Sequence, residues 1–295
     1  MIYLNLNTAY PTASSFAGVG KMFNKKLLNF YQRGFFEEKY KHPVRENLMI
    51  LFSDIKGFTQ MSEKFSSHDL FIMLDNFLTK ASLIIKQNDG KIDKYLGDGI
   101  LAYWNIQDKD VTYKLVLNTQ EKLRELSNEY STATNVDFTI GVGVHEGPAT
   151  IGYLGSSSQS NSKTKTLIGK NVNIASRLEG LTRKYGVEAL LSFPSQYARD
   201  THDFIFRKVD IVQVKGSSTV LHIYEPMRRS NENLAKREVY EQALKLYLSG
   251  KFYHAMHKFQ ILYDDNPSKL MSQRIKKLSL APKDDWDGVW NWTSK

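Results

Sequence analysis

Two aspartates in this chain stand where their side chains are poorly placed for packing and well placed for binding a cation. Asp54 closes the apolar run LMILFSD, and Asp98 lies between two glycines in YLGDGI. A carboxylate at the end of a hydrophobic strand is costly to bury without a partner. Two carboxylates on neighbouring strand ends would form an oxygen-rich site that suits Mg²⁺, which uses one or two carboxylates together with phosphate oxygens. Taken alone, the GDG sequence is more typical of an ordinary turn, and that alternative stays open.

The pattern of apolar residues predicts strands and helices that would position these two aspartates. The strand that ends at Asp54 precedes an amphipathic helix, and Asp98 lies at the turn of a hairpin. Helices are expected over 69–87, 110–128 and 171–184, strands over 47–54, 91–96, 99–104, 136–144, 150–154, 187–192, 203–215 and 219–225, and a polar flexible loop over 155–166. This order indicates an α+β domain whose helices cover one face of a sheet.

The flanks of this domain differ from it in composition. Residues 1–46 form an N-terminal extension, in which 22–40 could be a helix leading into the α+β domain at 47–226. Residues 227–295 form a small α-helical tail similar to one tetratricopeptide repeat. Because such repeats generally need several copies for stability, we expect the tail to pack on the main domain or on a protein partner. Its three C-terminal tryptophans indicate docking onto a surface.

Composition excludes several classes of protein. The 295 residues include 41% hydrophobic and 24% charged residues and no cysteine, so disulfides and thiolate metal sites are excluded. No apolar stretch approaches the length of a transmembrane segment, and the N-terminus lacks the pattern of a signal peptide. These features predict a cytoplasmic protein.

The net charge of +9 is confined to the flanks. Residues 1–46 hold seven basic and three acidic residues, residues 47–225 hold twenty of each, and residues 226–295 hold thirteen and eight. The main domain therefore has no net basic charge with which to bind nucleic acid. Solvated faces are the favoured interpretation of the basic flanks, and an acidic partner or a membrane surface is the less favoured one.

Three motifs in this sequence resemble those of the class III nucleotidyl cyclases. The segment LFSDIKGFT is similar to the first metal motif of that family, KYLGDG to the second, and NVNIASRLE to the motif that stabilises the transition state. The similarity runs from about 47 to 225, and three long motifs in the correct order are improbable by chance. The resemblance implies a ferredoxin-like βαββαβ core with extra strands.

The resemblance also implies a metal-assisted reaction. The ribose 3′-hydroxyl of a nucleoside triphosphate attacks the α-phosphorus, and pyrophosphate leaves. Asp54, Asp98 and the backbone carbonyl of Ile55 would hold two Mg²⁺ ions, with Mn²⁺ able to substitute.

Five further residues match binding positions of the family. Asn173 would orient the ribose and Arg177 would stabilise charge on the α-phosphate; they lie four residues apart, on one face of the expected helix. Lys215 matches the lysine that binds the triphosphate, although a surface lysine at a strand end is an equal alternative. Lys94 and Thr166 occupy the positions that select the base. A lysine ammonium only donates hydrogen bonds, which suits N1 of adenine and not the N1–H of guanine.

We therefore expect an adenylate cyclase that converts ATP to 3′,5′-cyclic AMP and pyrophosphate. In this family each site forms between two protomers, so the resemblance implies a homodimer in which the metal aspartates come from one chain and Asn173 and Arg177 from the other. A guanylate cyclase is the first alternative, and Lys94 argues against it. A catalytically inactive module for signalling or dimerisation is the second, and the intact site residues argue against it.

Overall fold

The computed structural model describes residues 38–155, 163–192, 200–280 and 286–292. The chain divides into two compact units, one made of residues 1–44 and 152–165 and the other of residues 45–151 and 166–295. All the site residues predicted from the sequence belong to the second unit. Of the helix expected at 22–40, residues 22–37 lie outside the described residues, and Glu38–Tyr40 form a short 3-10 helix.

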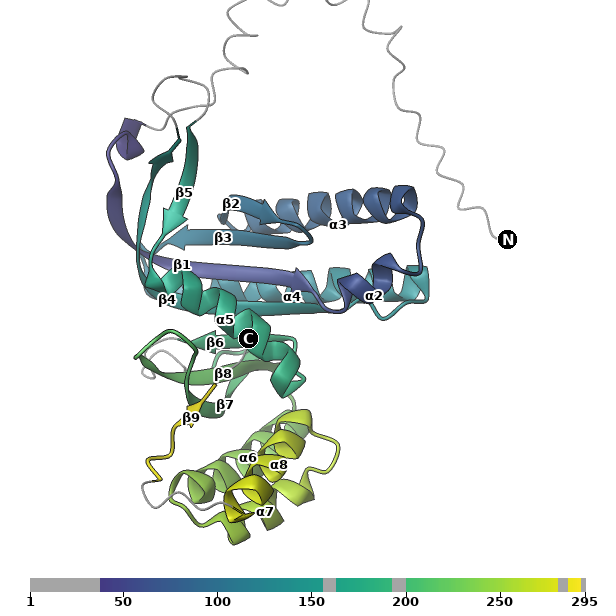
Figure 1. Cartoon of the computed structure of the whole chain (residues 1–295), viewed down its shortest axis with the longest axis vertical. Helices are drawn as coiled ribbons and strands as arrows, with labels where there is room; N and C mark the ends of the chain where they lie inside the picture. The colour runs from purple at the N-terminus through teal and green to yellow at the C-terminus, as the bar shows by residue number, and fades with distance from the viewer. Residues whose placement is uncertain (1–37, 156–162, 193–199, 281–285, 293–295) are drawn as a thin grey trace, which may run out of the picture. The chain divides into compact units, whose positions relative to one another are not determined.

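A mixed β-sheet forms the frame of the fold (Figure 1). Its order is β2-β3-β1-β4-β6-β8-β7-β9, and β5 pairs with β4 outside this path. The strands are β1 (Val44–Ile55), β2 (Lys91–Leu96), β3 (Gly99–Asn105), β4 (Ile140–Leu154), β5 (Thr164–Ile168), β6 (Ala189–Ser192), β7 (Phe204–Gln213), β8 (Val220–Arg228) and β9 (Trp290–Asn291). β3 pairs antiparallel with both β1 and β2, whereas β4 and β6 are parallel. The predicted α+β class is confirmed.

Several helices begin or end at residues with recognisable caps. The α-helices are α2 (Phe58–Ser62), α3 (Ser67–Gln87), α4 (Lys109–Thr134), α5 (Lys170–Tyr185), α6 (Asn231–Leu248), α7 (Phe252–Ile261) and α8 (Asn266–Leu280). The side chains of Ser66 and Asp108 accept hydrogen bonds from the first turns of α3 and α4. Gly186, with a φ of 65°, ends α5 in the left-handed conformation that glycine adopts without strain.

The helices pack on both faces of β4, so the expectation that they cover one face of the sheet is wrong. Val142 and Val144 share a hydrophobic cluster with residues of α3 and α4. Successive side chains of a strand point to opposite faces, and Gly141 and Gly143 meet α5 on the other face. A Cβ added at Gly143 would lie 2.2 Å from the backbone nitrogen of Glu179. The absence of side chains at Gly141 and Gly143 thus lets α5 pack directly on β4. A pattern of apolar residues in the sequence does not predict this contact.

Two predicted boundaries in the strands are also wrong. The strands expected at 136–144 and 150–154 are one continuous strand, β4. Pro148 lies within this strand, and the described ladder of β4 with β6, which runs from Val142 to His145, does not include it. Thr166 lies in β5 and not in a flexible loop; residues 156–162 of that expected loop lie outside the described residues.

The C-terminal tail packs on the α+β domain through buried charges. Helices α6, α7 and α8 share a hydrophobic cluster of their own. Arg207 of β7 donates 2.7 Å to the carboxylate of Asp265, at the start of α8. Arg274 of α8 is hydrogen-bonded to the buried Asp210 of β7 and donates 2.9 Å to the hydroxyl of Tyr185, at the end of α5. These contacts agree with the expectation that the tail packs on the main domain.

Candidate active site

The hairpin of β2 and β3 places Asp98 beside Asp54. Leu96 is paired with Gly99 at the turn, and Ser53 of β1 is paired with Ile100 of β3. A Cβ added at Gly99 would lie 2.8 Å from the backbone oxygen of Ser53 and 3.1 Å from Oδ1 of Asp54. Only glycine therefore lets the turn approach β1 this closely.

The two carboxylates form a crowded acidic site. The backbone N–H of Ile55 donates 3.2 Å to Oδ2 of Asp98. Burial is the main cause that raises the pKa of Asp98 to about 6, and the negative charge of Asp54 is the second. The raised pKa reflects both burial and repulsion between the two negative charges, so a cation bound between the carboxylates would stabilise their ionised forms. Among the described residues no group of three or more His, Cys, Asp or Glu side chains could hold a metal. Two carboxylates and the carbonyl of Ile55 would therefore fit Mg²⁺ only together with oxygens of water and of a substrate.

An ion pair that the sequence did not predict connects this site to α5. Nη2 of Arg183 donates 2.6 Å to Oδ2 of Asp54, and its Nη1 donates 2.9 Å to Glu179, one turn earlier. Burial raises the pKa of Glu179 to about 7 against the opposing effect of Arg183. Glu179 belongs to the third motif, but no motif identifies its partner Arg183, which lies 129 residues from Asp54.

Asn173 and Arg177 lie on the preceding turns of the same helix. The rise of an α-helix is 1.5 Å per residue, so Asn173 lies about 15 Å and Arg177 about 9 Å along the axis from Arg183. Asn173 is exposed, and no contact joins either residue to Asp54 or Asp98 among the described residues. Within the described part of one protomer, no contact therefore joins these two helix residues to the metal ligands.

The two residues expected to read the base contact each other. Nζ of Lys94 donates a short hydrogen bond to Oγ1 of Thr166, which is buried. Nζ of Lys94 also lies 3.2 Å from the carboxylate of Asp93, and Asp93 accepts a hydrogen bond of 3.0 Å from the backbone of Leu167. Strand β2 and strand β5 are thus joined by polar contacts at the predicted base site. Asp93 was not predicted, and its only signal is its place beside Lys94.

Lys215 and Arg177 share a hollow of about 670 Å³. It is lined by Ser176, Arg177, Glu179, Gly180, Leu181, Arg183, Lys184, Val214, Lys215 and Trp292. Nη1 of Arg177 is buried and has no hydrogen-bond partner among the described residues. The structure therefore brings together the two residues expected to bind phosphates, and it adds a tryptophan of the tail that the sequence did not assign to the site.

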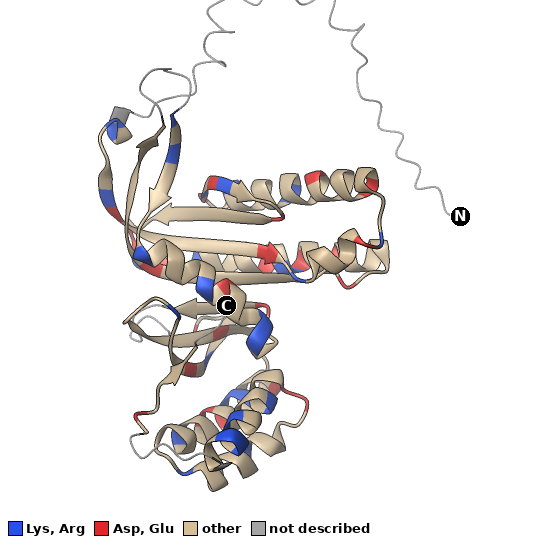
Figure 2. Ribbon diagram, in the orientation of Figure 1, with Lys and Arg blue, Asp and Glu red and all other residues tan. Residues whose placement is uncertain are grey.

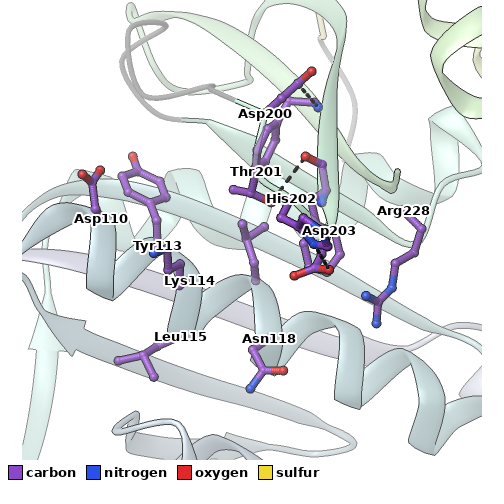
Figure 3. A pocket seen from close by; sticks show the side chains of 13 residues that line it. Asp110, Tyr113, Lys114, Leu115, Asn118, Asp200, Thr201, His202, Asp203 and Arg228 are labelled. Atoms are coloured by element: carbon purple, nitrogen blue, oxygen red, sulfur yellow. Dashed lines mark hydrogen bonds and ion pairs between the residues drawn. The ribbon is translucent and has the colours of Figure 1, made fainter. Parts of the chain in front are cut away.

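A second hollow, of about 950 Å³, lies against α4 (Figure 3). Its lining includes Asp110, Tyr113 and Asn118 of α4, the segment from Asp200 to Phe204, and Arg228. None of the predicted site residues lines it. Volume alone therefore does not identify the active site in this chain.

Comparison with known proteins defines the family. The family of the adenylate and guanylate cyclase catalytic domain matches residues 40–225, and the chain belongs to it. The chain is 34% identical over 186 residues to an adenylate cyclase of Anabaena cylindrica, which covers 60% of this chain and 36% of that protein. It is 30% identical over 256 residues to the adenylate cyclase, terminal-differentiation specific, of Dictyostelium discoideum, covering 80% of this chain and 12% of that one. The chain thus spans about a third or less of the length of these relatives.

The solved structures agree with this assignment. The adenylyl cyclase CyaB from P. aeruginosa superposes with a TM-score of 0.53 at 26% identity, over 64% of this chain and 98% of that one. The guanylyl cyclase Cya2 gives a TM-score of 0.51 at 25% identity, over 64% of this chain and 95% of that one. In the described part of the chain, no helix has the length and apolar character needed to cross a membrane.

Proposed function

We propose that this chain is an adenylate cyclase that converts ATP to cyclic AMP and pyrophosphate in a homodimer with shared sites. The observation that carries the proposal is the pair of crowded carboxylates, Asp54 and Asp98, held side by side by a turn that only glycine permits. Bound Mg²⁺ would lower the pKa of the ribose 3′-hydroxyl and neutralise charge on the leaving phosphates. The carbonyl of Ile55 would complete the protein's ligands.

The remaining residues would bind and orient the nucleotide. In the reaction the 3′-hydroxyl releases its proton to water, a bond forms between the 3′-oxygen and the α-phosphorus, and the bond from that phosphorus to the bridging oxygen of pyrophosphate breaks. The amide of Asn173 would orient the ribose, and the guanidinium of Arg177 would stabilise negative charge that develops on the α-phosphate. A preorganised donor of this kind is worth roughly 3–4 kcal/mol in the transition state. Lys215, in the same hollow as Arg177, would bind the triphosphate.

The geometry of α5 supports a site shared between protomers. Arg183 contacts Asp54 within one chain, and the rigid helix then keeps Asn173 about 15 Å further along its axis. A second chain can present its own Asn173 and Arg177 to these carboxylates, and a two-fold dimer would contain two such sites.

The choice of base rests on the pair of Lys94 and Thr166. The ammonium of Lys94 is anchored by the hydroxyl of Thr166 and the carboxylate of Asp93, so it is held in place as a donor. A donor fits the acceptor N1 of adenine and leaves the N1–H of guanine unpaired, which a buried site penalises strongly. Relatives named adenylate cyclase support the same choice.

A direct assay tests the proposal and its rivals. The purified protein is incubated with ATP or GTP in the presence of Mg²⁺ or Mn²⁺, and cyclic nucleotide and pyrophosphate are measured. Cyclic AMP from ATP is expected. Preferential formation of cyclic GMP would favour a guanylate cyclase, and no product with any metal and either nucleotide would favour a non-catalytic module.

A further inference from the structure

The hollow beside α5 has the charge of an anion-binding site. Four basic residues line it: Arg177, Arg183, Lys184 and Lys215. Figure 2 shows basic residues recurring along α5. Among the described residues that line this hollow, Glu179 is the only acidic one, and it forms an ion pair with Arg183. Such a concentration of positive charge favours a ligand with several negative charges, such as a polyphosphate.

The end of the C-terminal tail forms one wall of this hollow. Strand β9 runs parallel to the last residues of β7, with Trp290 paired with Val212 (Figure 1). The backbone N–H of Trp292 then donates 2.9 Å to the carbonyl of Gln213. This pairing brings the indole of Trp292 alongside Lys215, two residues further along the chain from Gln213.

Buried aromatic and ionic contacts hold the indole of Trp292 in this position. Its ring lies 6.0 Å from the ring of Tyr185, and the guanidinium of Arg274 lies 4.8 Å from its centre. Arg274 is itself fixed by Asp210 and by the hydroxyl of Tyr185. Residues of both α5 and α8 therefore hold the indole of Trp292, and the cation–π contact with the buried Arg274 restrains it.

Two buried donors of this lining lack a hydrogen-bond partner among the described residues: Nη1 of Arg177 and Nε1 of Trp292. Other tryptophans of the chain differ in this respect. The indole N–H of Trp104 donates 2.7 Å to the carbonyl of Asn88, and that of Trp286 donates 3.1 Å to the carbonyl of Tyr247. Buried donors are rarely left unpaired, because the loss of water is then uncompensated. Two such donors in one basic hollow indicate an acceptor-rich ligand.

We propose that Trp292 is a further substrate-binding residue, whose indole N–H donates to a phosphate oxygen of the nucleoside triphosphate beside Arg177 and Lys215. The identity of the nucleotide rests on the proposed function, whereas the recognition of its polyphosphate does not. The C-terminal tail is then a structural part of the active site.

The test observes the indole N–H directly in the full-length protein. Inorganic tripolyphosphate serves as the probe, and the indole ¹H–¹⁵N resonances of the tryptophans are recorded by NMR while it is added. The resonance of Trp292 should shift, and those of Trp104 and Trp286 should stay in place because their N–H groups already donate to backbone carbonyls. An unmoved Trp292 resonance, or no binding of tripolyphosphate at all, would overturn the proposal.

A pair of matched variants measures the same contact by calorimetry. Trp292→Phe keeps an aromatic ring and removes the donor, and it should weaken the binding of tripolyphosphate about tenfold or more, as loss of a hydrogen bond to a charged group does. Trp290→Phe, two residues earlier in the chain and outside the hollow, should bind as the wild type does. Equal affinities of Trp292→Phe and wild type would refute the contact. Since tripolyphosphate cannot be cyclised, either result stands whether or not the protein makes cyclic AMP.

Discussion

Gly143→Ala should damage the active site without changing any residue that touches substrate. The added Cβ would lie 2.2 Å from the nitrogen of Glu179 and 2.3 Å from the carbonyl oxygen of Ala175, both in the backbone of α5. Ordinary contact needs about 3.5 Å, so α5 must move away from β4 by roughly 1 Å. Overpacking of this kind costs about 1–3 kcal/mol, which corresponds to a Tm lower by roughly 3–9 °C. Because Asn173 and Arg177 move with the helix, kcat should fall by roughly 100-fold.

The matched control for this variant is Gly180→Ala, on the same helix. A Cβ added there meets no atom within 4 Å. Alanine is favoured over glycine inside a helix by about 1 kcal/mol, so this variant should be slightly more stable than the wild type and serves as the control for stability. Tm is measured by calorimetry and kcat by formation of cyclic AMP. If the Gly143→Ala protein has the stability and kcat of the wild type, the close packing of α5 on β4 does not position Asn173 and Arg177.

Three further predictions concern the base, the pH dependence and the tail. Lys94→Glu combined with Thr166→Cys should lower the ratio of kcat/KM for ATP over that for GTP, and an unchanged ratio would show that these residues do not read the base. The pKa of Glu179 is raised from 4.5 to about 7 in the folded protein, so its contribution to stability is present below pH 4.5 and is lost as the pH rises through 7. Between pH 5 and 8 the free energy of unfolding of the wild type should therefore fall by up to about 3 kcal/mol more than that of Glu179→Gln, and parallel urea-denaturation profiles of the two proteins would contradict this. Arg274→Met should destabilise the protein by about 3–5 kcal/mol because it leaves the buried carboxylate of Asp210 without its counterion; Arg274→Met with Asp210→Asn should recover much of that loss, and an undiminished loss would refute the ion pair.

The sequence was most informative where local signals and motifs coincide. The hairpin around Asp98 and the helix that carries Asn173 and Arg177 were predicted within a residue or two, because glycines mark both the turn and the end of the helix. The resemblance assigned Lys94 and Thr166 to the selection of one base, and the structure brings the two side chains together.

The contacts that were missed depend on residues far apart in the chain. The pairing of Arg183 with Asp54 depends on the packing of α5 on Gly141 and Gly143. Nothing in the sequence around these glycines predicts that a helix packs on them. Trp292 reaches the hollow because two residues of the tail add a strand to β7, and a two-residue strand is too short to be recognised from alternation. Tertiary contacts alone establish these parts of the site.

The measurement that tests the shared site most directly mixes two inactive variants. Asp54→Ala lacks a metal ligand, and Arg177→Ala lacks the donor to the α-phosphate, so each homodimer should be inactive. In a heterodimer one site has both lesions, and the other combines intact aspartates of one chain with intact Asn173 and Arg177 of its partner. Equal amounts should give about half heterodimers, each with one working site of two, so activity should return to roughly a quarter of the wild-type value if the sites act independently. If a tagged pull-down demonstrates exchange of protomers and the mixture stays inactive, the site is not shared between chains.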